Sequence, residues 1–93
     1  MAKSIKRRER KTAKMGHFDY EKFVTDLSKR IKTIRKQKGF SSYEHFSYDI
    51  GISRASMAKF DSGNFSDIRI RTLLLIIDGL GLTPKEFFSE GFD

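Results

Sequence analysis

The sequence contains no cysteine, and this absence excludes disulfide bonds and zinc sites built on thiolates. Its two histidines, His17 and His45, are isolated and too few to hold a metal ion, so we expect no metal and no other cofactor. The longest apolar run, residues 73–77, is far shorter than the ~20 residues of a membrane helix. A secretory signal requires an apolar stretch after a basic N-terminus, and this sequence has none there. We therefore expect a soluble chain in a reducing cytoplasm, with no membrane contact.

The positive charge of the chain is concentrated at one end. The formal net charge is +7, and residues 1–17 carry seven basic side chains against one acidic side chain. The other 76 residues carry 12 basic and 11 acidic side chains and are almost neutral. A segment so charged and so poor in apolar groups does not pack, so we expect a disordered basic arm over 1–17 and one folded domain over 18–93. Such an arm either solubilises or targets the chain, or binds a polyanion.

Helix signals begin directly after this arm. Apolar residues recur at three- and four-residue spacing between a potential N-cap, Asp19, and a stop signal, Gly39, and predict a first helix there. A second helix is predicted to begin at Ser41, which has the spacing of a capping box with Glu44, and to end at Gly51.

Three further helices are predicted in the second half of the chain. Ser53 can cap the third, which Gly63 closes. The fourth, over about 68–79, is apolar on nearly all sides, which predicts that it is the most buried element. The tetrapeptide TPKE at 83–86 combines a cap, a proline and a capping-box acid and begins a short fifth helix. With no credible strand, the sequence predicts an all-α, compact five-helix bundle.

The spacing around Gly51 is typical of two short helices that pack at a steep angle across a tight turn. Small residues stand where space is limited: Ser47 at the closest approach of the helices, and Gly51 in the turn, where a positive φ costs other residues roughly 1–2 kcal/mol. The positions that must be apolar in such a pair are Phe46, Ile50, Ile52, Met57 and Phe60. This pattern predicts a helix-turn-helix, whose second helix enters the major groove of DNA.

Four stretches carry a resemblance to a known family: 31–39 (IKTIRKQKG), 51–56 (GISRAS), 60–63 (FDSG) and 80–88 (LGLTPKEFF). Residues 27–88 resemble the Cro and phage-repressor type of helix-turn-helix domain, also called the xenobiotic-response-element family. The resemblance implies a lambda-repressor-like domain that binds double-stranded DNA as a bacterial transcriptional regulator, usually a repressor. The closing residues 87–93 (FFSEGFD) are similar to the ends of small regulators of this type from the Bacteroides group of bacteria.

The resemblance assigns base contacts to Arg54, Ala55 and Lys59, in the third helix. Arg54 can bond guanine bidentately, Lys59 can donate to guanine or phosphate, and Ala55 offers an apolar contact such as one with a thymine methyl. A DNA-contacting glutamine of the family falls here on Ser42 or Tyr43, because this chain has one residue more between Gly39 and Gly51 than is usual. Phosphate contacts are expected from Ser42, Tyr43, Ser53, Ser56, Asn64 and Ser66. For Ser53, Ser56 and Ser66, helix capping is an equally good interpretation.

Two further sets of contacts are expected, one from the charge of the arm and one from the resemblance. Beside a DNA-binding motif, we expect the arm to contact DNA through Lys6, Arg7, Arg8, Arg10 and Lys11. Arg35 and Asp61 match the positions of an ion pair that clamps the third helix, although aspartate is one methylene shorter than the glutamate usual in the family.

The resemblance also suggests protein partners. Family members usually form homodimers, and we assign pairing to a hydrophobic C-terminal surface; its alternative role is to cap the monomer core. This surface comprises Leu82, Phe87, Phe88 and Phe92. Antitoxins that share the fold bind both DNA and a toxin protein and regulate their own operon, so a toxin partner is the alternative function. We do not expect an enzyme, because neither histidine has a nucleophile or carboxylate at useful spacing.

Overall fold

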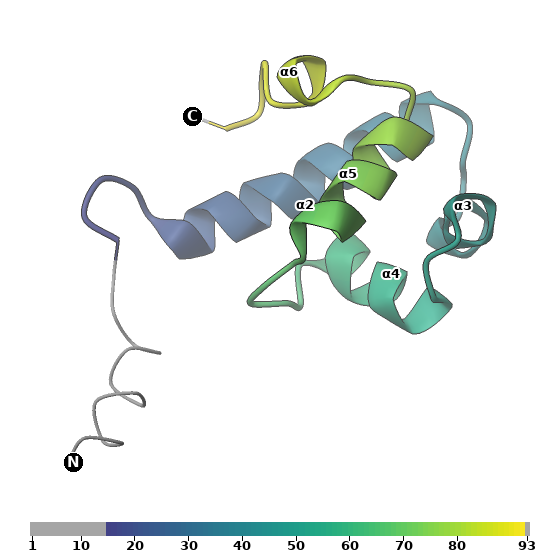
Figure 1. The fold of residues 1–93 in the computed structure, drawn as a ribbon, viewed down its shortest axis with the longest axis horizontal. Coiled ribbons are helices and arrows are strands. Elements are labelled where there is room, and N and C mark those ends of the chain that lie inside the picture. The colour runs from purple at the N-terminus through teal and green to yellow at the C-terminus, as the bar shows by residue number, and fades with distance from the viewer. Residues whose placement is uncertain (1–14, 93) are drawn as a thin grey trace, which may run out of the picture.

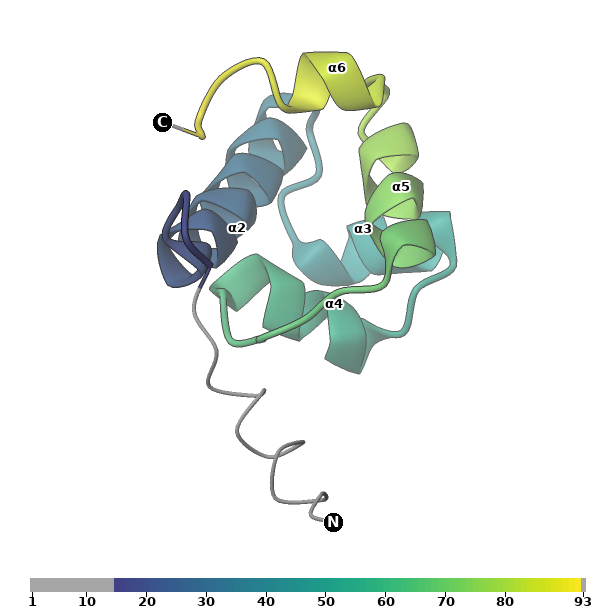
Figure 2. The same cartoon turned by 60° about the vertical axis from the view of Figure 1, so that its left-hand side comes forward.

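A computed structural model describes residues 15–92 of the chain. These residues form α2 (Tyr20–Gln37), α3 (Tyr43–Ile50), α4 (Arg54–Ser62), α5 (Ile70–Gly79) and α6 (Pro84–Phe87), with no strand among them. The expected all-α class with five helices is thus confirmed. In Figure 1, α5 crosses in front of the long α2, and α3 and α4 lie together at one end. Figure 2 shows α2 and α5 as opposite sides of the molecule, with α4 below the space between them and α6 above it.

The predicted boundaries of α2, α4 and α6 are confirmed by their caps. Asp19 Oδ1 accepts a hydrogen bond from Lys22 N at 3.2 Å and begins α2. Ser53 Oγ accepts from Ser56 N at 3.1 Å and begins α4. At α6, Thr83 and Glu86 form both hydrogen bonds of a capping box. These caps satisfy amides that have no partner inside the helix.

The predicted start of α3 was wrong by one residue. Its N-cap is Ser42, which has an extended backbone and whose Oγ accepts from His45 N at 3.2 Å. In a capping box the acid stands three positions after the N-cap. That position after Ser42 is His45, so Glu44 takes no part in a capping box. Ser41 stays in the connecting segment, because the backbone turns into the helix only after Ser42.

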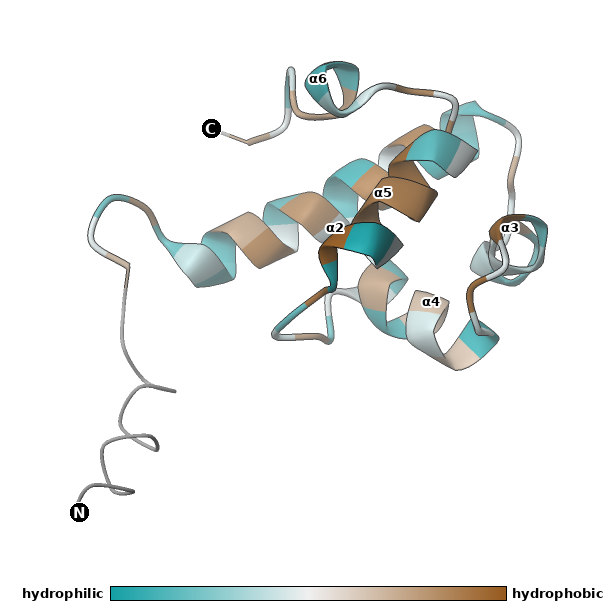
Figure 3. Cartoon of the chain, in the orientation of Figure 1, coloured by the Kyte–Doolittle hydropathy of each residue, from teal (hydrophilic) through white to brown (hydrophobic). Residues whose placement is uncertain are grey.

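The prediction that the fourth helix is the most buried element was also wrong. Figure 3 shows α5 as mostly hydrophobic, whereas hydrophilic and hydrophobic residues alternate along α2. Only one side of α5 is covered, however, because its neighbours in residues 15–92 pack against that side alone: Ile70 is 73% and Leu74 is 44% exposed. The longer α2 supplies more buried side chains than α5 does.

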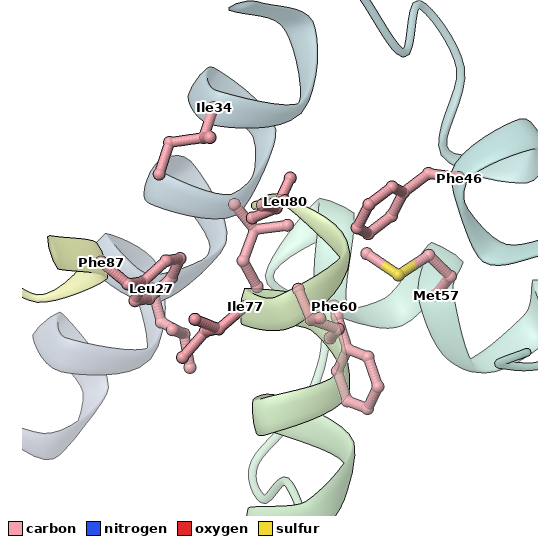
Figure 4. Close-up of a cluster of buried hydrophobic side chains, with 10 residues drawn as sticks. Leu27, Ile34, Phe46, Met57, Phe60, Ile77, Leu80 and Phe87 are labelled. Carbon is pink, nitrogen blue, oxygen red and sulfur yellow. The ribbon is translucent and has the colours of Figure 1, made fainter. Parts of the chain in front are cut away.

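The hydrophobic core lies where α2, α4 and α5 meet, and α3 and α6 close it from two sides. Figure 4 shows these side chains converging from all five helices. The buried cluster consists of Leu27, Ile31, Ile34, Phe46, Met57, Phe60, Ile76, Ile77, Leu80 and Phe87. Burying each large apolar side chain stabilises the fold by about 1.5–3 kcal/mol, so this cluster dominates the packing energy.

The C-terminal segment is tied to α2 by Arg30. Arg30 Nε donates to Phe87 O at 2.8 Å, Nη2 donates to Glu86 O at 3.1 Å, and the guanidinium lies 5.7 Å from the centre of the Phe87 ring. Phe87 is completely buried. The assignment of Phe87 to a pairing surface was therefore wrong, because this side chain caps the core of its own protomer. Leu82 and Phe92 also pack against the core and are half-buried, and only Phe88 of this group is exposed.

Candidate nucleic-acid interface

The turn between α3 and α4 fixes the angle of the two helices. Gly51 has φ +78°, a left-handed conformation that favours glycine, and no atom lies within 4 Å of the place where a Cβ would stand. The amides of Gly51 and Ile52 both donate to Ser47 O at 3.0 Å and end α3. Ser47 itself is buried, and its hydroxyl donates to Glu44 O at 2.8 Å. The backbone thus makes a tight turn without leaving the buried hydroxyl unsatisfied.

Helix α4 has a buried face and an exposed face. Met57 and Phe60 are buried in the core, while Arg54, Ala55 and Lys59 are exposed. A helix with this division presents its polar side chains to solvent as one rigid set. The structure therefore places all three residues to which base contacts were assigned on the outer face of the second helix of the pair.

A buried ion pair holds the C-terminal end of α4 against α2. Arg35 Nε and Nη2 donate to the two carboxylate oxygens of Asp61 at 3.1 and 3.4 Å. Arg35 Nη1 also donates to Phe40 O at 2.6 Å, and Ser28 Oγ donates to Asp61 O at 2.9 Å. The structure thus brings Arg35 and Asp61 together bidentately, and the shorter aspartate still reaches the guanidinium. This bidentate geometry restrains the orientation of α4 relative to α2.

The hydroxyls considered for phosphate contacts differ in the protons they have available. Ser42 and Ser53 both cap helices, and Ser53 also donates its proton to Ser56 Oγ at 2.9 Å. A capping oxygen accepts from the backbone and can still donate its own proton. Ser42 and Ser56 can therefore donate to a phosphate without breaking one of these hydrogen bonds. Ser53 can do so only after its hydrogen bond to Ser56 Oγ is broken.

The remaining candidates lie at the start of α3 and in the loop after α4. Tyr43 is half-buried and packs against the core, which leaves only part of its side chain at the surface. Asn64 and Ser66 are exposed in the loop between α4 and α5. Tyr20 Oη donates to Ser66 O at 2.6 Å and ties this loop to the start of α2. The five arm residues, Lys6, Arg7, Arg8, Arg10 and Lys11, lie outside the described residues.

One contact at this surface was missed by sequence reasoning. Arg54 Nη1 lies 3.6 Å from Glu44 Oε2, and both side chains are largely exposed. The sequence pattern assigned Glu44 to a capping box instead. The two residues stand on different helices, ten positions apart, so no helical spacing indicates the contact; it results from the packing of α3 on α4.

Two further properties concern the described part of the chain as a whole. Within residues 15–92, no group of three or more histidine, cysteine, aspartate or glutamate side chains is arranged to hold a metal ion. No helix in that range is both long enough and apolar enough to cross a lipid bilayer.

Comparison with known proteins places this geometry in a family. Residues 30–89 match the family model of the Cro/C1-type HTH DNA-binding domain, which is more than half of the chain. No curated protein and no solved structure matches the chain. The matched range contains α3, the turn, α4, α5 and α6. The chain therefore belongs to the Cro/C1-type helix-turn-helix family of DNA-binding transcription regulators.

Proposed function

We propose that this protein is a sequence-specific repressor whose α4 enters the major groove of double-stranded DNA. The observation that supports this proposal is the division of α4, with Met57 and Phe60 in the core and Arg54 and Lys59 on the outer face. A clamped helix with exposed cations presents hydrogen-bond donors to base edges in a fixed register.

Arg54, Ala55 and Lys59 of α4 each have their own role in this proposal. Arg54 bonds guanine O6 and N7, which is the commonest specific contact in the major groove. Lys59 donates to guanine or to phosphate, and Ala55 contacts a thymine methyl. Ser42, Ser56, Asn64 and Ser66 bond phosphates and fix the register of the protein on the duplex.

The basic arm adds affinity that does not depend on sequence. Its cations lie along phosphates or in the minor groove, where they replace condensed counterions. This contribution is large relative to that of α4, because only Arg54 and Lys59 in α4 offer base-specific hydrogen bonds.

The protein acts as a homodimer in this proposal, with half-sites about one helical turn apart. Phe88, with the half-buried Leu82 and Phe92, supplies the pairing surface, since Phe87 is buried. Sedimentation of the protein with its DNA tests this part. A two-to-one complex of protein and duplex is expected, and a strictly one-to-one complex contradicts the dimer.

Selection of bound sequences from random duplex DNA tests the proposed function. The expected product is one enriched motif that contains guanine and is repeated as two half-sites in inverted orientation. Recovery of the starting distribution of sequences would refute sequence-specific binding. A single half-site would leave specific binding intact and refute the dimer.

A further inference from the structure

Glu44 is placed beside the residue to which we assign the main base contact. Its Oε2 lies 3.6 Å from Arg54 Nη1, and the two side chains are 52% and 72% exposed. The acid comes from α3 and the base from the first position of α4. Because α4 has no acidic residue in its own first turn, the carboxylate that faces Arg54 is supplied by the neighbouring helix.

This arrangement leaves the donors of Arg54 available. A guanidinium has five N–H donors, and a single carboxylate oxygen at one Nη engages only part of them. The two bonds that guanine requires can still form. A side chain that is held by a neighbour loses less conformational freedom on binding than one that is free in solution.

The charge of Glu44 has a second effect. An arginine that faces DNA can bond phosphates as well as bases, and phosphate bonds carry no sequence information. A carboxylate next to the guanidinium offsets its charge and is itself repelled by phosphates, which weakens the attraction of Arg54 to any backbone. Guanine, an uncharged acceptor of two hydrogen bonds, is affected less. The ion pair thus disfavours binding to wrong sequences more than binding to the right one.

We propose that Glu44 is a specificity-determining residue: its contact with Arg54 positions the guanidinium for guanine and suppresses binding through phosphates. This proposal rests on the proposed function, since it takes Arg54 as the residue that contacts bases. Glu44 is a positioning residue here, because it acts through Arg54.

Glu44→Gln keeps the size of the side chain and removes its charge. Asp49→Asn is the matched control, because Asp49 is an exposed acid on the same helix and makes no ion pair shown within residues 15–92. Dissociation constants are measured for each variant on the selected duplex and on random duplex of equal length, with melting temperatures to verify folding. Removing an exposed ion pair of this kind changes an equilibrium constant by about two- to fivefold.

We expect Glu44→Gln to lower the ratio of specific to random affinity by about two- to fivefold, through tighter binding to random DNA. Asp49→Asn should strengthen binding to both duplexes equally and keep the ratio. The loss of specificity in Glu44→Gln should occur at the same base position that Arg54→Ala affects. In the Arg54→Ala background, Glu44→Gln should cause no further loss of specificity at that position. Equal ratios in Glu44→Gln and Asp49→Asn would overturn the role of Glu44. Full base preference in Arg54→Ala would instead overturn the base contact of Arg54, which is the part of the proposed function on which this inference rests.

Discussion

At the scale of single residues, the buried ion pair of Arg35 and Asp61 joins α2 to the C-terminal end of α4. Arg35 is almost completely buried, and its partner Asp61 accepts from two of its nitrogens. Taking both charges out of water is unfavourable, and only good geometry compensates for it. If Asp61 loses its charge, the guanidinium of Arg35 remains buried without a carboxylate partner.

Asp61→Asn should therefore destabilise the protein by about 3–5 kcal/mol, measured as the free energy of unfolding in urea. Glu90→Gln is the control, because it removes the same charge from the ion pair of Arg30 with Glu90, whose side chain is 77% exposed. Exposed pairs contribute about 0–1 kcal/mol, so this variant should unfold nearly as the wild type does. Equal effects of the two substitutions would contradict a structural role for the buried pair.

At the scale of elements, the helix-turn-helix depends on a small side chain between α3 and α4. Ser47 is 3% exposed, and these two helices pack closely around it. Ser47→Leu should force them apart and cost about 1–3 kcal/mol of unfolding free energy. Tyr48→Leu places leucine one position further along, where the native side chain is 85% exposed, and should change stability by less than about 0.5 kcal/mol. An unchanged melting temperature in Ser47→Leu would show that the two helices are not packed in this way.

The sequence predicts a feature well when the interactions that cause it lie within a few residues along the chain. The caps at Asp19, Ser53 and Thr83 act over three residues, and all three were predicted correctly. At α3 the sequence predicted Ser41 as the cap, and the use of the adjacent Ser42 instead depends on the path of the backbone. The exposure of Leu74 depends on what covers the outer side of α5. Hydropathy alone contains no information about that.

The candidate site divides in the same way. The exposure of Arg54 and Lys59 follows from the period of α4, since Met57 and Phe60 define its buried face. The contact of Glu44 with Arg54 and the burial of Phe87 depend on how separate elements dock. No spacing along the chain indicates either of them.

At the scale of the whole molecule, most of the net charge lies in a different segment from the residues that we propose for base recognition. Residues 1–17 carry almost all of the net charge, whereas the rest of the chain is nearly neutral. We therefore expect the arm to set the salt dependence of binding and α4 to set the sequence preference.

Replacing Lys6, Arg7, Arg8, Arg10 and Lys11 by glutamine tests this separation. The plot of log affinity against log salt should become shallower by up to ~0.9 for each lost phosphate contact, and the relative preference among sequences should not change. Lys85→Gln is the control, since it neutralises a lysine of α6, on the side of the molecule opposite α4 (Figure 2). A steep slope that survives in the arm variant would show that the arm does not contact DNA.

The central claim is that α4 recognises bases through Arg54, and protein–base substitution cycles test it most directly. Wild type and Arg54→Ala are compared on the selected duplex and on duplexes in which one base pair at a time is changed. The account predicts that Arg54→Ala loses about 1–3 kcal/mol on the selected duplex and no longer distinguishes the bases at one guanine position, while it keeps its preference elsewhere. Equal loss of affinity for specific and random DNA, with every base preference intact, would contradict it.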